Sequence, residues 1–168
     1  NIGISRTWQQ VRLFKYLTIL DHLQLVDSND NTKLFVNLTF QPKTDVAKYQ
    51  QILDQFGIER PLDTVVTDLS YCQRKLLHLA MALHSSHRLL LLDEPVAGVN
   101  PVIQERIEQF LMTLKQKNET VMVVEHDIEF VKRLADYVVV MDQGRVLVEG
   151  EPREVLEDKR VVNAYLGV

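Results

Sequence analysis

The chain has 168 residues, of which 46% are hydrophobic and 25% are charged, and its net charge at pH 7 is -4. This length suits one domain with its own core, and the composition is that of a globular protein, which excludes a disordered chain. The negative net charge and the lack of a lysine- and arginine-rich run argue against nucleic acid as a partner. The single cysteine, Cys72, excludes an internal disulfide, and no apolar run approaches the ~20 residues needed for insertion across a membrane.

The first half of the chain is predicted to contain one strand and two helices joined by polar loops. The strand covers Ile2–Trp8, and the polar residues Gln9 and Gln10 follow it. Helical spacing covers Leu17–Val26, with Thr18 as the cap, and returns in Asp45–Phe56, which Gly57 ends. Residues 27–33 read as a polar loop, and residues 34–40 fit a strand or an irregular insertion.

The second half alternates between helical and strand patterns. Helices are predicted at Tyr71–His84, Val102–Gln116, Ile128–Ala135, Glu151–Glu157 and Val161–Leu166. Strands are predicted at Leu89–Leu92, Thr120–Val124 and Tyr137–Met141, and a tight turn at residues 142–144 leads into a hairpin strand at Arg145–Val148. This alternation is typical of βα units around a parallel sheet, whereas residues 17–66 have the character of an inserted helical subdomain.

Two adjacent acids, Asp93 and Glu94, follow the leucine run Leu89–Leu92. Such a run suits a strand that is buried on both faces of a parallel sheet. Ligands of open α/β sheets bind beyond the carboxyl ends of the strands, so the two carboxylates are placed to meet a metal ion and a reacting water. The alternative is a buried strand that simply ends in two solvated acids.

Six short stretches carry the functional signal: Arg6–Gln9, Leu69–Gln73, Leu89–Glu94, Ala97–Asn100, Val123–Asp127 and Asn163–Gly167. In this order they resemble the Q-loop, signature, Walker B strand, D-loop, switch-histidine segment and C-terminal ending of the ATP-binding subunits of ABC transporters. Among these, the chain is most similar to the type that serves importers of branched-chain amino acids and urea. Each stretch alone is a weak signal, but the ordered set covers nearly the whole chain.

The resemblance implies an α/β fold of the P-loop NTPase (RecA-like) type, with a parallel sheet flanked by helices. Residues 1–168 then form a partial ABC ATPase domain. Within it, about 11–85 make the helical subdomain with the signature, and residues 1–10 and 86–168 belong to the catalytic core.

The resemblance also implies ATP and Mg²⁺ as cofactors and a role for each matching residue. Glu94 is the expected general base and His126 the second catalytic residue, which contacts the terminal phosphate. Asp93 and Gln9 are the expected Mg²⁺ ligands. The residues expected to bind the nucleotide are Gln9, Ser70, Cys72, Gln73 and Asn100. The residues alone leave other roles open for three of them: Gln9 could simply end a strand, Ser70 could be a plain helix cap, and His126 could be satisfied by Asp127 or by backbone.

The implied function is that of the subunit that binds and hydrolyses ATP to power an importer. The expected partners are transmembrane permease subunits and a second, identical or different, ATPase subunit in a head-to-tail dimer. The expected location is the cytoplasmic face of the plasma membrane.

The sequence departs from the family pattern in two places. It has no G-x-x-x-x-G-K-[ST] phosphate loop, and none of its six glycines is followed by lysine. In the family this loop precedes the Q-loop. We therefore expect that the N-terminal part of the protein is missing from this chain and that the chain is inactive on its own. The alternative is a non-catalytic regulatory domain that has lost the loop. The second departure is Cys72, which stands where the signature usually has a glycine whose backbone approaches the phosphate.

Overall fold

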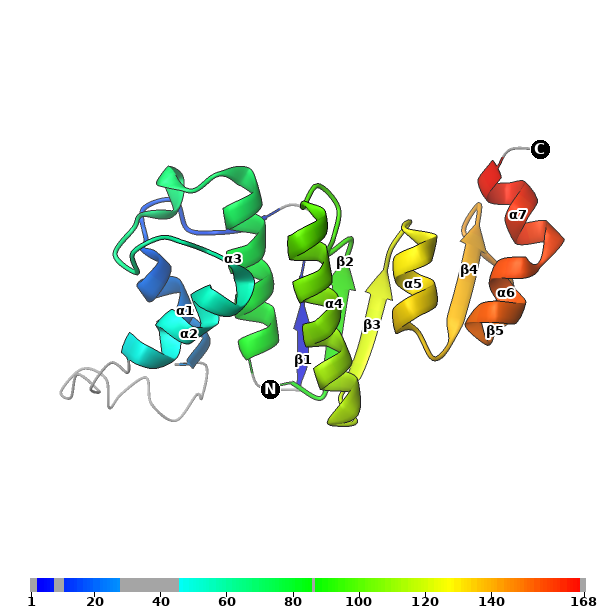
Figure 1. Cartoon of the computed structure of the whole chain (residues 1–168), viewed down its shortest axis with the longest axis horizontal. Helices are drawn as coiled ribbons and strands as arrows, with labels where there is room; N and C mark the ends of the chain where they lie inside the picture. The colour runs from blue at the N-terminus through cyan, green and yellow to red at the C-terminus, as the bar shows by residue number, and fades with distance from the viewer. Residues whose placement is uncertain (1–2, 8–10, 28–45, 86, 167–168) are drawn as a thin grey trace. The chain divides into compact units, whose positions relative to one another are not determined.

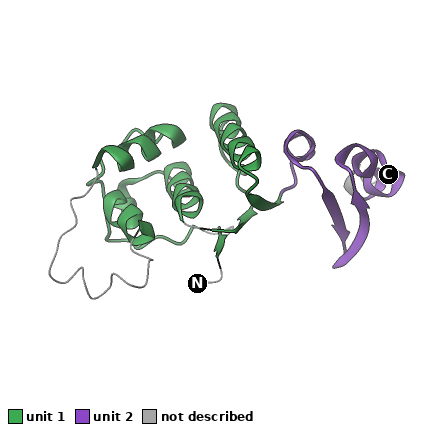
Figure 2. Ribbon diagram, turned by 90° about the horizontal axis from the view of Figure 1, so that it is seen from below, with its two compact units in different colours: residues 1–124 green, residues 125–168 purple. Residues whose placement is uncertain are grey.

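The computed structural model describes residues 3–7, 11–27, 46–85 and 87–166. The chain divides into two compact units, Asn1–Val124 and Glu125–Val168 (Figure 2). The predicted strand or insertion at residues 34–40 lies outside the described residues, as does most of the loop before it. Within the described part of the chain, no helix is long and apolar enough to cross a membrane.

The first unit contains a three-stranded parallel sheet (Figure 1). Strand β2 (Leu89–Asp93) lies between β1 (Ile4–Arg6) and β3 (Thr120–Val124). Leu89 is in register with Ile4 on one side and with Thr120 on the other. The predicted parallel sheet is therefore confirmed, and Ile4 of its first strand pairs with Leu89, which lies 85 positions further along the chain.

Helix α4 (Pro101–Gln116) packs on one face of this sheet. Asn100 caps it, since its Oδ1 accepts a hydrogen bond of 2.9 Å from the Ile103 N–H, and the fixed backbone of Pro101 favours the first helical position. Helical spacing predicts an apolar stripe on this helix. Four of its residues are buried, Ile103, Ile107, Leu111 and Leu114, whereas the fifth, Phe110, is only half-buried.

Strand β2 is not buried on both faces in the described part of the chain, which corrects the expectation from its four leucines. Leu90 and Leu92 are buried, with exposed fractions of 0% and 2%, whereas Leu89 and Leu91 are only half-buried. The helices of residues 1–124 lie on one side of the strands (Figure 2), so only the leucines on that side are covered.

Three helices and a 3₁₀ turn make up the helical part of the first unit: α1 (Ile19–Asp27), α2 (Val46–Phe56), η1 (Val66–Asp68) and α3 (Tyr71–His84). Thr18 caps α1 as predicted, because its Oγ1 accepts from the Asp21 N–H at 3.1 Å. In return, Asp21 Oδ2 accepts from the Thr18 hydroxyl at 2.7 Å and from the Thr18 N–H at 2.8 Å, and these two bonds lower the pKa of Asp21.

The buried face of α1 differs from the apolar stripe that helical spacing predicts, which consists of Leu17, Leu20, Leu23 or Gln24, and Leu25. Ile19, His22 and Leu23 are buried, and Leu25 is exposed. His22 can be buried because both ring nitrogens have backbone partners. Its Nδ1 lies 2.7 Å from the Thr18 carbonyl oxygen, and its Nε2 accepts from the Phe14 N–H at 3.0 Å.

The ends of the three helices meet at Asp27. Its carboxylate accepts hydrogen bonds from Lys48 Nζ at 2.9 Å and from Tyr49 Oη at 2.5 Å, both on α2, and lies 3.7 Å from His84 Nε2 on α3. Partial burial raises the pKa of Asp27, but the bonds from Tyr49 and Lys48 outweigh burial and hold that pKa below its usual value.

The second unit is a hairpin covered by short helices: α5 (Ile128–Leu134), β4 (Val138–Asp142), β5 (Arg145–Gly150), α6 (Pro152–Glu157) and α7 (Lys159–Leu166). β4 and β5 pair antiparallel, which confirms the predicted hairpin. Its turn places Gln143 at φ 47° and Gly144 at φ 78°, the two positive angles of a type I′ turn. The core of the unit is made of Val138, Val140, Val155 and Val161.

Candidate nucleotide site

The carboxyl end of β2 places Asp93 between β1 and β3. On one side, Asp93 is in register with Val124, the last residue of β3. On the other side, its N–H donates to Thr7 Oγ1 at 3.1 Å, and the Thr7 N–H donates to the Leu91 carbonyl at 2.9 Å. Thr7 is buried, with 5% of its surface exposed. The side chain of Thr7, which lies within the predicted Q-loop motif just after β1, therefore binds the backbone of β2 at its carboxyl end.

Glu94 begins the turn that leads from β2 to α4. Its φ of 46° lies in the left-handed region, which side chains with a Cβ atom disfavour. Its N–H donates to the Val124 carbonyl at 2.9 Å, and its own carbonyl accepts from Lys75 Nζ at 2.7 Å. The backbone of the predicted general base is thus held from β3 and from α3.

Ser70 and Gln73 form a capping box at the N-terminus of α3. Ser70 Oγ accepts from the Gln73 N–H at 3.2 Å, and Gln73 Oε1 accepts from the Ser70 N–H at 3.0 Å. Cys72 lies in the first helical turn and is a free, half-buried thiol. First-turn N–H groups have no partner within a helix, so this end favours an anion such as phosphate.

Asn100 has a structural role in the described chain as the cap of α4. This bond uses one lone pair of its side-chain oxygen, and its amide NH₂ group is the part that could donate to a phosphate oxygen. Its predicted place in the nucleotide site remains a prediction.

His126 follows β3 and belongs to the second unit. Its side chain is exposed, and its Nδ1 lies 3.8 Å from Glu125 Oε2. Asp127 serves as the cap of α5, with its Oδ1 accepting from the Phe130 N–H at 3.0 Å. That His126 meets Asp93 and Glu94 at one phosphate stays a prediction, and Gln9 lies outside the described residues.

The described residues suit a Mg²⁺ ion whose remaining ligands would be phosphate oxygens and water. No group of three or more His, Cys, Asp and Glu side chains in the described ranges could enclose a metal ion. Mg²⁺ typically takes one or two protein carboxylates together with substrate phosphates and water. Asp93, half-buried at the strand end, offers one such carboxylate.

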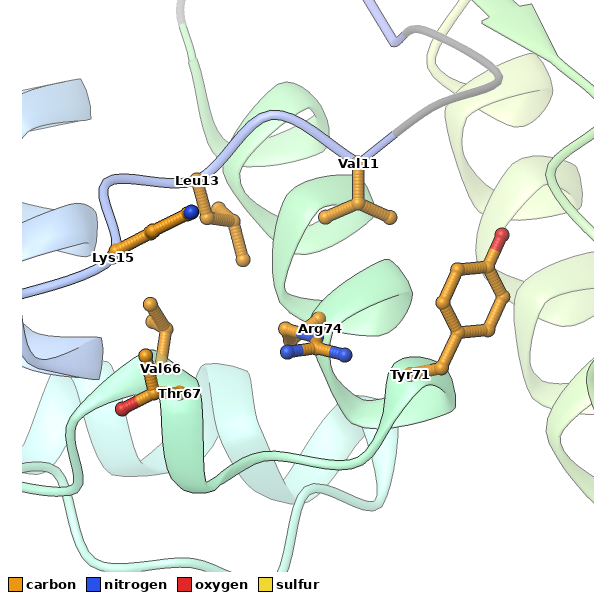
Figure 3. A pocket seen from close by; sticks show the side chains of 7 residues that line it. All are labelled: Val11, Leu13, Lys15, Val66, Thr67, Tyr71 and Arg74. Atoms are coloured by element: carbon orange, nitrogen blue, oxygen red, sulfur yellow. The ribbon is translucent and has the colours of Figure 1, made fainter.

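A separate hollow of about 330 Å³ lies beside the N-terminal half of α3 (Figure 3). Its lining combines apolar, hydroxyl-bearing and basic side chains from the segment after the Q-loop, from η1 and from α3: Val11, Leu13, Lys15, Val66, Thr67, Tyr71 and Arg74. Neither Asp93 nor Glu94 lines it, so this hollow is distinct from the acidic strand end.

Sequence reasoning missed Thr7 and Lys75 as partners of the two acids. Thr7 lies within the predicted Q-loop motif, but nothing in that motif indicates which strand its hydroxyl contacts. Lys75 follows the signature on α3, and nothing in the sequence distinguishes it from a lysine on the solvent-facing side of a helix. Both contacts join residues far apart in the chain, and only the fold brings them together.

Carboxylates at the carboxyl end of a parallel strand and a capped helix N-terminus are features that nucleotide-binding ATPases use to hold a metal ion and phosphate. Residues 2–97 match the family model described as ABC transporter, and the chain belongs to that family. The family is a class of ATP-hydrolysing enzymes, so the predicted class is confirmed.

The relatives agree with this assignment. The chain is 29% identical over 174 residues to the high-affinity branched-chain amino acid transport ATP-binding protein LivG of Escherichia coli strain K12, covering 99% of this chain and 68% of the relative. It is 30% identical over 173 residues to the protein BraF of Pseudomonas aeruginosa, which has the same description, covering 98% of this chain and 68% of the relative. The chain therefore spans about two-thirds of the length of these curated relatives.

The fold matches that of solved ATP-binding cassettes. A nucleotide-free cassette from an ABC transporter superposes with a TM-score of 0.72 at 30% identity, covering 99% of this chain and 69% of the other. A cassette in its ADP conformation gives a TM-score of 0.70 at 29% identity, also over 99% of this chain and 69% of the other. The predicted α/β fold class is confirmed.

Proposed function

We propose that the protein containing this chain is the ATP-hydrolysing subunit of an importer for branched-chain amino acids or a similar small solute such as urea. The observation that carries this proposal is the pair Asp93 and Glu94 at the carboxyl end of β2, held by contacts from Thr7 just after β1, from β3 and from α3. The relatives named for branched-chain amino acid transport support the solute class.

Mg²⁺, when bound, neutralises charge on the terminal phosphates of ATP. Asp93 is the carboxylate that would hold it, together with Gln9. Glu94 accepts a proton from the attacking water or orients it, and His126 donates to the terminal phosphate. The N-terminus of α3, with Ser70 and Gln73, binds the phosphate of the ATP held by a second subunit.

The hollow beside α3 supports the proposal that this unit docks on a transmembrane permease. Its apolar residues and the two cations Lys15 and Arg74 suit a partner segment with apolar and acidic side chains. Such docking places the protein at the cytoplasmic face of the plasma membrane. A second ATPase subunit completes the two shared ATP sites.

The test is a Glu94→Gln variant of the full-length protein. The amide keeps the size of the side chain but cannot take a proton from water, so we expect nucleotide binding to be retained and turnover to be lost. Glu157→Gln, an exposed change at the end of α6, is the matched control and should hydrolyse ATP normally. Sustained hydrolysis by Glu94→Gln would contradict the assignment.

The same experiment separates the enzyme from a non-catalytic domain. Full-length wild-type protein that neither binds nor hydrolyses ATP would favour a regulatory domain that has lost the phosphate loop. The 168-residue chain alone is expected to show no saturable ATP binding, because it lacks the G-x-x-x-x-G-K-[ST] loop that cradles the phosphates.

A further inference from the structure

Lys75 connects the signature helix to the turn that carries the predicted general base. It lies in the second turn of α3 and is half-buried. Its Nζ donates to the Glu94 carbonyl at 2.7 Å and also to the Ala97 carbonyl. One ammonium group therefore bridges two backbone oxygens that lie three residues apart in the same turn.

This turn needs an external support because of its backbone conformation. Glu94 has a φ of 46° and Gly98 a φ of 73°, and only the glycine adopts such an angle without steric cost. The internal hydrogen bonds of the turn are long. The Ala97 N–H lies 3.3 Å from the Glu94 carbonyl, and the Val99 N–H lies 3.3 Å from the Val96 carbonyl.

The ammonium of Lys75 suits this task. A charged donor forms stronger hydrogen bonds than a neutral one, and an ammonium group can donate to several acceptors at once. It also offsets the repulsion between the two carbonyl dipoles that converge on it. On the opposite side, the Glu94 N–H is bound to the Val124 carbonyl, so the peptide groups on both sides of the Glu94 Cα are fixed.

We propose that Lys75 is a positioning residue that holds the backbone of Glu94 in its left-handed conformation and couples the helix capped by Ser70 to the predicted general base. This inference rests on the proposed function for the role of Glu94 in hydrolysis. The two hydrogen bonds from Lys75 to the Glu94 and Ala97 carbonyls, here called the bridge, lie within this chain and can be tested without ATP. A movement of α3, whose N-terminus is the predicted phosphate site, is then transmitted to Glu94 through one side chain.

The first test measures the bridge by amide hydrogen exchange in the chain itself. Lys75→Met keeps most of the side-chain length and removes the donors, so the Glu94 and Ala97 amides should exchange about tenfold faster. Lys75→Arg retains a charged donor and should restore most of the protection. Lys117→Met is the matched control, because Lys117 is exposed just after α4, and it should leave these amides unchanged. Unchanged exchange in Lys75→Met overturns the proposal.

The second test measures hydrolysis in the full-length protein. Lys75→Met should lower kcat about tenfold or more with little change in KM, and Lys75→Arg should recover part of the loss. If Lys75→Met instead lowers activity only because less protein is folded, the loss reflects a lower concentration of active enzyme. In that case the activity of Lys75→Arg should rise only as far as its thermal stability does. If Lys75→Met does not fold, Lys75→Leu, which also lacks a donor, takes its place in both tests.

The two tests separate failure of the inference from failure of the proposed function. Wild-type protein that lacks ATPase activity refutes the proposed function, and the exchange experiment then decides on the bridge alone. Active wild-type protein with a normal kcat in Lys75→Met refutes the coupling, even where exchange is faster.

Discussion

Two substitutions at Ser70 separate its function as a helix cap from its predicted function as a phosphate ligand. In the structure, Ser70 Oγ accepts from the Gln73 N–H at 3.2 Å, and the reciprocal bond from the Ser70 N–H to Gln73 Oε1 is 3.0 Å long. Ser70→Ala removes the first bond and leaves the second in place. Ser70→Asp keeps an acceptor at the cap and adds a negative charge.

The expected magnitudes follow from this geometry. Loss of a serine cap costs about 1 kcal/mol, and because Ser70 is exposed we expect a loss of about 0.5–1 kcal/mol for Ser70→Ala. With an m-value of about 2 kcal/mol/M in urea, the midpoint of unfolding falls by about 0.25–0.5 M. Ser70→Asp should leave the midpoint unchanged or raise it, since a carboxylate at a helix N-terminus contributes about 0.3–1 kcal/mol.

Activity should follow a different order. In the full-length protein, the carboxylate of Ser70→Asp would repel the phosphate, so ATP hydrolysis should fall far more in Ser70→Asp than in Ser70→Ala. The assays are urea unfolding followed by circular dichroism and steady-state release of phosphate. Normal hydrolysis by Ser70→Asp would show that Ser70 is only a cap, and an unchanged midpoint in Ser70→Ala would refute the contribution of the cap.

Three further predictions concern neighbouring parts of the molecule. Cys72→Gly in the full-length protein should raise ATPase activity, because it removes a side chain where the backbone is expected to approach phosphate, and an equal or lower rate would contradict this reason. Thr7→Val removes the acceptor of the Asp93 N–H, so the Asp93 amide should exchange faster in Thr7→Val than in Thr7→Ser, and equal rates would argue against the contact. Burial lowers the pKa of His78 from 6.5, so the unfolded state takes up a proton first as pH falls. The free energy of unfolding should therefore decrease below about pH 6.5, and less steeply in His78→Gln, as urea titrations at several pH values can measure.

Much of the local structure could be predicted because its signals lie close together in the chain. The helix at Tyr71–His84 has both predicted boundaries, since Ser70 and Gln73 specify its start within one turn. The strand at Thr120–Val124 also has its predicted bounds, and the hairpin follows from the turn at Gln143 and Gly144. The two acids could be identified as candidate site residues because they directly follow a leucine strand, and ligands of parallel sheets bind at the carboxyl ends of the strands.

Tertiary structure alone decided how those acids are held and which faces are covered. The contact of Thr7 with Asp93 spans 86 positions, and that of Lys75 with Glu94 spans 19, so no local pattern contains either one. Helical spacing predicts that leucines form the buried face of α1. His22 is nevertheless buried, because the Phe14 N–H and the Thr18 carbonyl are the hydrogen-bond partners of its two ring nitrogens. The sequence by itself determined the residue types and their order along the chain. Their partners depend on which distant segments the fold brings within hydrogen-bond reach, because a hydrogen bond acts only over about 3 Å.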